Sequence, residues 1–451
     1  MRNFYVQNFG CRATQADGAA VEQQFLNRGL ERAAAPSEAQ VVILNTCTVT
    51  ASADQDARAA IRRIHRENPK CQIIVTGCYA QRAPEQVAAL PGVAQVIGNS
   101  HKHRLAEIAE PAFLPLEHLQ TQDTAHEIPI FVSDIFAHAE LLAAPVFDAA
   151  NERTRPNLKV QDGCDNRCSF CVIPSVRGSS RSLPLSQILE QVTALIGAGY
   201  REVVISGINL GRWGRDLPGR LCFEDLVRSI LDHTSLEKLR ISSVEPMDWS
   251  DQLIELIAAS ARIAKHAHVP MQSGSDRILR RMYRKYRPWH YREKIEKIRT
   301  ALPDAAIGAD VMVGFPGETD ADFEQTRRMI DDLPFTYLHV FTYSARPTTP
   351  AAEMSDQVPA RVARERNRAL RELAAKKKLA FMRAFVGKTL PAITLSRTPT
   401  SAGCDFTEAL TDNYLKLWLN GTQEPNRWLM ATIEDVRNGM LTGTPSSLAG
   451  C

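Results

Sequence analysis

The sequence predicts an α/β protein of more than one domain, and three observations support this fold class. The chain has 451 residues, enough for two or three domains. In the first 140 residues, apolar runs alternate with helical patterns at about 15–29 and 53–67, which predicts a parallel sheet with right-handed crossovers. From Gly387 to about Gly443, alternating apolar stretches separated by Gly and Asn turns predict a small antiparallel β-barrel.

The apolar runs of the N-terminal part each end in a cysteine. "NFYVQNFGC" ends at Cys11, "AQVVILNTC" at Cys47 and "QIIVTGC" at Cys78. Because ligands gather beyond the carboxyl ends of parallel strands, we expect these three cysteines to converge. Cys71 begins the strand that Cys78 ends, roughly 20 Å away, so we expect it to be structural. The pattern favours an iron–sulfur cluster on the three cysteines over three unrelated core residues.

A second group of cysteines lies in "VQDGCDNRCSFCVIPSVRGSSRS" (160–182), between an extended run and a helical pattern that starts at about Ser186. The group consists of Cys164, Cys168 and Cys171, with no His and no further Cys within 15 residues on either side. A closed zinc site needs four ligands, whereas three thiolates on a four-iron cluster leave one iron open for chemistry. The alternative is a zinc site completed by a distant Cys or His.

The composition indicates the cellular compartment of the protein more clearly than its binding partner. The formal net charge is only +3, and the sequence shows no basic-then-apolar leader and no run of about 18 apolar residues. We therefore expect a cytoplasmic protein without a membrane segment, where structural disulfides are disfavoured. Several of the ten cysteines should then be metal ligands or reactive thiols, whereas Cys404 and Cys451 have no ligand-like spacing and Cys222 is assigned no role.

The spacing of the second cysteine group resembles that of radical S-adenosylmethionine (radical SAM) enzymes. The contexts Gly-Cys, Asn-Thr-Cys and Gly-Cys around the first group are similar to those of the methylthiotransferases within that superfamily, and the resemblance covers nearly the whole chain. It implies an N-terminal methylthiotransferase domain (1–140), a radical SAM core with a partial (β/α) barrel (150–384) and a TRAM-like RNA-binding barrel (385–447). It also implies two [4Fe-4S] clusters, one on each cysteine group, and S-adenosyl-L-methionine on the open iron of the second group.

The same resemblance implies further contacts to S-adenosylmethionine. Phe170 matches the aromatic position that lies against the adenine, and Ser206 and Gly207 in "VVISGINLGRWGRDL" match a segment near the amino group. Glu245 in "RISSVEPMD" and Gln272 in "HVPMQSGSDRILRRMYRKY" stand where the family places polar contacts. No side chain is identified as a catalytic acid or base. This sequence departs from the usual family residues at Thr14, Ser175 and Thr348.

The stretch "NTCTVTASADQDAR" (45–58) most resembles the branch that modifies N6-threonylcarbamoyladenosine beside the tRNA anticodon. The implied reaction places a methylthio group on carbon 2 of the base, with the radical supplied at one cluster and the sulfur at the other. The implied partners are the tRNA anticodon stem-loop and an electron donor such as flavodoxin or ferredoxin, with the chain acting as a monomer. The alternatives are methylthiolation of a ribosomal-protein aspartate, methylthiolation of isopentenyladenosine in tRNA, and a non-catalytic zinc-dependent RNA-binding protein.

Two basic stretches are candidate RNA contacts. Residues 277–299 and 361–388 each carry ten Lys or Arg against two acids, and the second stretch belongs to a helix expected at about 359–384. Positive charge attracts phosphates, and aromatic faces stack on unpaired bases. The first stretch contains four aromatic residues, Tyr283, Tyr286, Trp289 and Tyr291. The alternative for either stretch is an ordinary solvated helix face.

Overall fold

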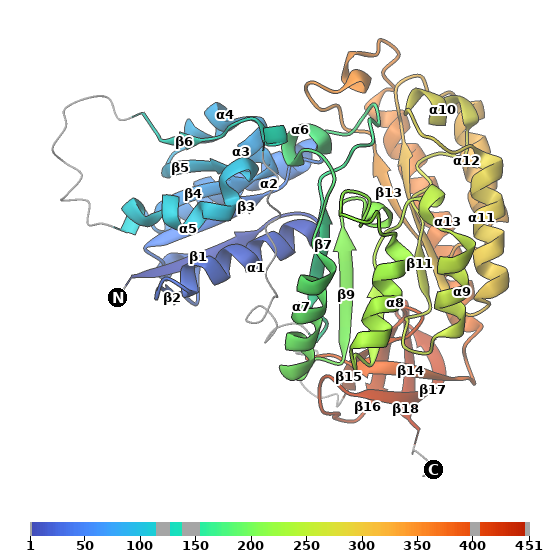
Figure 1. Ribbon diagram of the computed structural model, residues 1–451. Helices are drawn as coiled ribbons and strands as arrows, with labels where there is room; N and C mark the ends of the chain where they lie inside the picture. The colour runs from blue at the N-terminus through green and yellow to red at the C-terminus, as the bar shows by residue number, and fades with distance from the viewer. Residues whose placement is uncertain (1, 114–126, 138–153, 397–405, 447–451) are drawn as a thin grey trace. The chain divides into compact units, whose positions relative to one another are not determined.

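The computed structural model describes residues 2–113, 127–137, 154–396 and 406–446 (Figure 1). The chain divides into two compact units, each described here by itself. The first unit comprises three stretches, Met1–Val146, Leu158–Leu183 and Ser344–Ala352. The second unit comprises Phe147–Asn157, Pro184–Tyr343 and Glu353–Cys451. The predicted domain boundaries at 140, 150, 384 and 447 stay predictions.

A six-stranded parallel sheet with the order β2-β1-β3-β4-β5-β6 forms the centre of the first unit, as the strand–helix alternation predicts. Its strands are β1 (Asn3–Asn8), β2 (Glu31–Arg32), β3 (Val41–Thr46), β4 (Gln72–Gly77), β5 (Val93–Gly98) and β6 (Ile130–Phe131). The connecting helices are α1 (Arg12–Leu26), α2 (Ala51–Glu67), α3 (Cys78–Arg82), α4 (Pro84–Ala88) and α5 (Leu105–Ile108). Both predicted helices are confirmed, and each begins two or three residues earlier than expected.

Helices cover both faces of this sheet because successive side chains of a strand point to opposite sides. Val42 and Leu44 of β3 pack with α2, α3 and α4, whereas Val41 and Ile43 pack with α1 and α5. Every residue of β3 is buried, which is typical of a central parallel strand. Cys71 lies in the core on the α2 side, where it is 6% exposed, so its predicted structural role is confirmed.

The remaining part of the first unit carries the second cysteine group. Strand β7 (Asn157–Asp162) pairs with the short antiparallel strand β8 (Arg181–Ser182). The loop between them contains helix α6 (Ile173–Arg177). Because β7 and β8 are paired, they hold the two ends of the loop next to each other.

The second unit alternates strands with helices, as expected for the barrel part of the chain (Figure 1). Strands β9 (Glu202–Gly207) and β10 (Lys238–Ile241) are parallel neighbours, and so are β11 (His266–His268), β12 (Ala306–Val313) and β13 (Tyr337–Thr342). The helices are α7 (Leu185–Gly197), α8 (Phe223–His233), α9 (Asp251–Ala259), α10 (Asp276–Arg281), α11 (Pro288–Ala301), α12 (Asp320–Asp332) and α13 (Ala360–Arg383). Helix α13 confirms the long helix predicted at about 359–384.

The C-terminal stretch forms the closed five-stranded barrel that its apolar alternation predicts. Its strands are β14 (Thr389–Thr394), β15 (Phe406–Thr411), β16 (Lys416–Asn420), β17 (Trp428–Arg437) and β18 (Met440–Pro445). Four of its strand pairs are antiparallel, but β16 and β18 are parallel. The exception arises because β17 follows β16 in the chain yet lies on the far side of β18.

Candidate active site

The first cysteine group lies at one edge of the parallel sheet. Cys11 follows β1 by three residues and caps α1, Cys47 directly follows β3, and Cys78 directly follows β4 as the first residue of α3. Strand β3 is the neighbour of both β1 and β4. The expected position of all three cysteines at the carboxyl edge is therefore confirmed.

The backbone packs closely around these cysteines. Gly10 has φ +96°, and a Cβ atom there would lie 2.5 Å from Cys47 Cβ and 2.9 Å from Cys47 Sγ, so only glycine fits. Burial and the nearby Cys78 and Cys11 sulfurs raise the pKa of Cys47 to about 12. Three cysteines at one edge of a sheet are a donor set of the kind that binds a common metal group, and a bound metal would stabilise their thiolate forms.

Thr14 stands on α1 at the position where the family usually has Asn. Its side chain is 1% exposed, and its Oγ1 lies 3.5 Å from Cys11 Sγ. The residue that departs from the family thus contacts a cysteine of the first group directly.

The second cysteine group lies in a loop that is tied at its base. The Cys164 amide donates to the Gly178 carbonyl (3.1 Å), and the Cys171 amide donates to the Cys168 carbonyl (3.1 Å). Gly163 has φ +71°, and a Cβ atom on it would lie 1.9 Å from the Ser179 carbonyl oxygen. All three cysteines are half-buried, as is Phe170. The loop therefore offers its thiols at a partly open surface.

Asn99 connects the two cysteine groups within the first unit. Its Nδ2 donates to Cys78 Sγ (3.5 Å) and to the Val176 carbonyl (2.8 Å). Cys78 also packs against Val172 and Val176 in a small apolar cluster. Helix α6, which directly follows the second group, is thus held against the first group. Sequence reasoning missed this role for Asn99, because an Asn after a strand is usually a turn residue.

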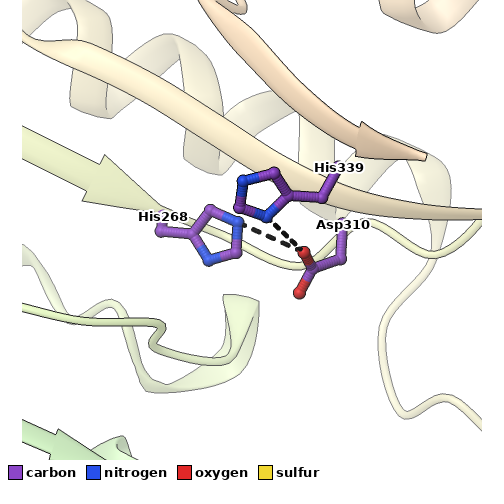
Figure 2. Close-up of side chains that lie close together, drawn as sticks. All are labelled: His268, Asp310 and His339. Carbon is purple, nitrogen blue, oxygen red and sulfur yellow. Dashed lines mark hydrogen bonds and ion pairs between the residues drawn. The ribbon is translucent and has the colours of Figure 1, made fainter. Parts of the chain in front are cut away.

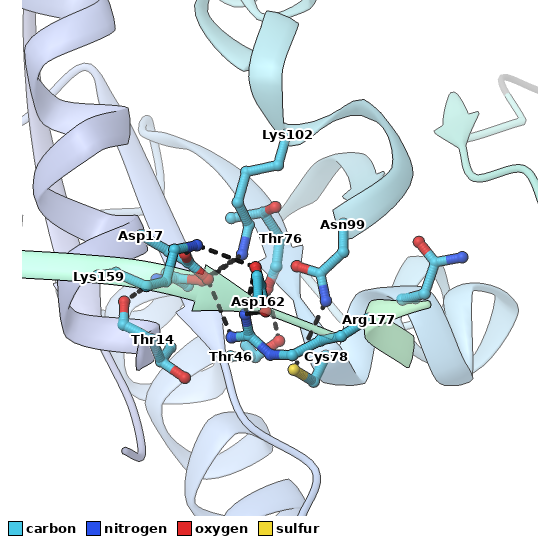
Figure 3. Close-up of polar contacts among 12 residues, drawn as sticks. Thr14, Asp17, Thr46, Thr76, Cys78, Asn99, Lys102, Lys159, Asp162 and Arg177 are labelled. Atoms are coloured by element: carbon cyan, nitrogen blue, oxygen red, sulfur yellow. Dashed lines mark hydrogen bonds and ion pairs between the residues drawn. The ribbon is translucent and has the colours of Figure 1, made fainter. Parts of the chain in front are cut away.

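A cluster of five buried charges lies beside the first cysteine group (Figure 3). We call it the buried charge cluster, and it consists of Asp17, Lys102, Lys159, Asp162 and Arg177. Asp17 of α1 accepts from Lys102 (3.2 Å), from Lys159 and from Arg177 (2.9 Å). Asp162 of β7 accepts from Lys159 (2.9 Å) and Arg177 (2.9 Å). The cluster joins α1, which follows Cys11, to β7, which leads to Cys164.

The buried charge cluster carries one excess positive charge, from three cations and two carboxylates. Burial alone would raise the pKa of Asp17, but Lys102, Lys159 and Arg177 together lower it to about 2. Burial would lower the pKa of Arg177, but Asp162, Cys78 and Asp17 raise it well above its usual value. Charged groups inside a protein need such partners, and the excess charge favours anionic sulfur ligands nearby.

A second polar cluster holds the chain directly after Cys47. Thr48 donates to Asp54 (2.6 Å), and Arg82 donates to Thr48 (2.8 Å) and Asp54 (2.8 Å). Arg346 also donates to Thr48 (3.2 Å) and to Asp54, which brings the stretch Ser344–Ala352 to this loop. Thr50 caps α2 by accepting from the Ala53 amide (3.2 Å). Several residues of "NTCTVTASADQDAR" thus position the Cys47 loop.

The other expected cofactor contacts lie in the second unit. Ser206 is 2% exposed near the end of β9, and its Oγ makes no hydrogen bond to the described residues. Gly207 ends the same strand. The Glu245 carboxylate accepts from Arg284. Gln272 has φ +62°, and its backbone amide donates to the Asp310 carbonyl (2.8 Å). A buried hydroxyl without a partner and a constrained Gln backbone fit a ligand-binding role.

Two aromatic residues of the first basic stretch are not RNA contacts, so that part of the prediction is wrong. Tyr286 and Tyr291 are each 1% exposed, and their hydroxyls donate to backbone carbonyls of residues 269–271. Tyr291 lies on the buried face of α11, and the ring of Tyr286, just before that helix, packs 5.8 Å from it. Tyr283 and Trp289 are 53% and 57% exposed and stay candidates.

The cysteines outside the two groups have separate roles. Cys222 is the N-cap of α8, and its backbone amide donates to the Asp225 carboxylate (2.9 Å) as in a capping box, while its Sγ donates to the same oxygen (2.9 Å). Cys404 and Cys451 lie outside the described residues.

Comparisons with known proteins identify both halves of the chain. Residues 3–98 match the family described as "Uncharacterized protein family UPF0004", and residues 158–330 match the radical SAM superfamily. Among solved structures, the radical SAM methyltransferase TsrM from Kitasatospora setae shares the fold, with a TM-score of 0.56 and 14% identity over 78% of this chain and 77% of that one. The first class to be assigned is therefore that of radical SAM enzymes, which use S-adenosylmethionine and a [4Fe-4S] cluster.

Curated relatives narrow the class. A protein from Aquifex aeolicus named threonylcarbamoyladenosine tRNA methylthiotransferase MtaB is 36% identical over 95% of this chain and 99% of its own. The MtaB protein from Bacillus subtilis is 35% identical over 92% and 90%. A tRNA-2-methylthio-N(6)-dimethylallyladenosine synthase from Novosphingobium aromaticivorans is 34% identical over 86% and 85%. The chain belongs to the radical SAM methylthiotransferases, in the MtaB-type branch.

None of the helices in the described ranges is both long and apolar enough to cross a bilayer.

Proposed function

We propose that this enzyme adds a methylthio group to carbon 2 of N6-threonylcarbamoyladenosine beside the anticodon of tRNA. The observation that carries the proposal is the pair of three-cysteine groups in one unit, in a chain whose MtaB-named relatives match it over most of its length. Two groups with three thiols each are suited to two clusters that each keep one iron open.

In this proposal, Cys164, Cys168 and Cys171 hold the cluster that binds S-adenosylmethionine, and Cys11, Cys47 and Cys78 hold a second [4Fe-4S] cluster. When bound, these groups supply the one-electron chemistry and the sulfur that a side chain cannot supply. The donor set fits, because thiolates are the usual ligands of iron–sulfur clusters. Asn99 and the buried charge cluster hold the two loops in fixed positions and favour thiolate ligands.

Contacts to S-adenosylmethionine are assigned to Phe170, Ser206, Gly207, Glu245 and Gln272. The buried Ser206 hydroxyl would donate to or accept from the cofactor, since no described residue satisfies it. Glu245 is already oriented by Arg284. These residues bind and orient the cofactor, and none of them is assigned a proton transfer.

Recognition of the anticodon stem-loop is assigned to basic surface, exposed aromatic residues and the C-terminal barrel. Trp289 and Tyr283 offer faces on which unpaired bases can stack, and barrels of this size often bind oligonucleotides. A flavodoxin or ferredoxin as electron donor, a cytoplasmic location and a monomeric state complete the proposal.

The test is a mass analysis of tRNA nucleosides from a strain that lacks the gene. The 2-methylthio form of N6-threonylcarbamoyladenosine should disappear, and its unthiolated precursor should accumulate. The intact gene should restore the modification, whereas Cys168→Ala and Cys47→Ala variants should not, and Cys71→Ala should restore it as the matched control. Unchanged tRNA nucleosides would contradict the substrate and direct the search to the ribosomal protein.

A further inference from the structure

Three potential metal ligands lie side by side on one face of the sheet β11-β12-β13 in the second unit (Figure 2). His268 ends β11, Asp310 lies within β12 and His339 lies within β13. Asp310 is the direct partner of His339 in the parallel register, and His268 is paired with Gly308, two residues before Asp310. Because side chains alternate along a strand, the three project from the same face.

The distances among their polar atoms suit a bound ion. Asp310 Oδ1 lies 3.4 Å from His268 Nε2 and 3.2 Å from His339 Nδ1, and all three ligand atoms lie within 4.8 Å of one another. Metal bonds of about 2.0–2.1 Å in a tetrahedral site place neighbouring ligand atoms roughly 3.4 Å apart. The carboxylate oxygen therefore already stands at the spacing of neighbouring corners of such a site from each imidazole nitrogen.

His268 has the environment of a ligating histidine. It is 5% exposed, and its Nδ1 lies 2.5 Å from Ser243 Oγ. A partner at one ring nitrogen fixes the ring and leaves the other nitrogen for the metal. His268 Nε2 is buried, and its contact among the described residues is the 3.4 Å approach to Asp310 Oδ1, which has the distance of an ion pair without the geometry of a hydrogen bond. A buried ring nitrogen of this kind costs free energy unless an ion or a proton satisfies it.

The opposite side of the cluster is open to solvent. The His339 side chain is 55% exposed and that of Asp310 is 26% exposed. An ion can therefore reach the carboxylate, and three protein ligands would leave a coordination position for water or for an oxygen of a bound molecule.

We propose that His268, Asp310 and His339 bind one divalent transition-metal ion of the zinc type. Two imidazoles and one carboxylate favour Zn²⁺, Fe²⁺, Co²⁺ or Ni²⁺ over Mg²⁺ and Ca²⁺, which prefer oxygen ligands alone. The proposed site contains no cysteine, so it is chemically distinct from both cysteine groups and goes beyond the proposed methylthiotransferase reaction.

The test measures zinc and iron together in the cluster-loaded enzyme. The protein is prepared without oxygen, equilibrated with micromolar Zn²⁺, separated from free metal and analysed for both elements. The wild type should hold one more zinc ion per chain than His339→Ala and Asp310→Asn, at equal iron content. His290→Ala, which removes an exposed histidine of α11, is the matched control and should bind zinc as the wild type does.

The same samples give a second readout in their melting temperature. Zinc should raise the Tm of the wild type and of His290→Ala, and should not raise that of His339→Ala. Since His339 is largely exposed, its replacement should not prevent folding. Equal zinc content in all variants would overturn the proposal and assign the three residues to a hydrogen-bonded cluster. Zinc that increases only as iron decreases would also overturn it, because the zinc would then occupy empty cysteine groups.

Discussion

Thr348 shows at the scale of one residue why the family usually has glycine at its position. Its φ is +71°, in the left-handed region, where a β-branched side chain is strained. The residue is exposed, and no contact in the structure explains the threonine. The departure noted in the sequence therefore carries a cost in backbone conformation, in a stretch that also contacts the loops of both cysteine groups through Arg346 and Ala351.

Thr348→Gly should stabilise the protein by about 1 kcal/mol, because release of the left-handed strain exceeds the entropy that glycine gains in the unfolded chain. The expected result is a rise in Tm of roughly 2 °C. Thr348→Val keeps the β-branched shape and serves as the control, with no such rise. A lower Tm for the glycine variant would show that the threonine contributes contacts that outweigh the strain.

At the scale of elements, the buried charge cluster joins α1 to β7. Asp17 accepts from all three cations, and its side chain is 2% exposed. Removal of its charge would leave Lys159 and Arg177 with Asp162 as their carboxylate partner, and would take from Lys102 its ion pair with Asp17. Buried ion pairs contribute little net stability when complete, but the loss of one partner costs much more.

Asp17→Asn should therefore lower the free energy of unfolding by about 3–5 kcal/mol. The measurement is denaturant unfolding of the cluster-free and cluster-loaded enzyme. Arg28→Ala, which breaks the exposed pair with Glu110, is the control and should cost about 0–1 kcal/mol. Equal costs for the two variants would mean that the buried cluster does not hold α1 and β7 together.

The elements show what a sequence can and cannot predict. The positions of Cys11, Cys47 and Cys78 were predictable, because apolar runs locate strands and parallel strands align their carboxyl ends. The ion pairs between Asp17 and Arg177 were not predictable, because the partners are far apart in sequence and either residue alone resembles a solvated surface charge. The prediction that Tyr291 contacts RNA was wrong for a related reason, since its place in the core or on the surface depends on which face of α11 packs inward.

At the scale of the whole molecule, the proposed RNA surface depends on a few exposed residues within long basic stretches. Much of the stretch 277–299 is neutralised by ion pairs, such as Arg292 with Asp332 and Arg287 with Asp276. Trp289, 57% exposed on α11, is then a more specific candidate than the charges.

Trp289→Ala should weaken binding of an anticodon stem-loop about tenfold, since base–aromatic stacking contributes about 1–3 kcal/mol. A gel-shift titration of the cluster-loaded enzyme measures the change in Kd. Phe136→Ala removes an exposed aromatic residue of the first unit and is the control, with unchanged Kd. An unchanged Kd for Trp289→Ala would exclude this residue from the RNA surface and leave Tyr283, the basic surface and the barrel as candidates.

The three-stretch construction of the first unit sets an order of events during biosynthesis. Synthesis starts at the N-terminus, so Cys11, Cys47 and Cys78 leave the ribosome before the loop with Cys164. The unit is complete only when its last stretch, which ends at Ala352, has also left the exit tunnel. Until then the nascent thiols lack their final surroundings, so we expect the proposed clusters of the first unit to be completed late in the maturation of the enzyme.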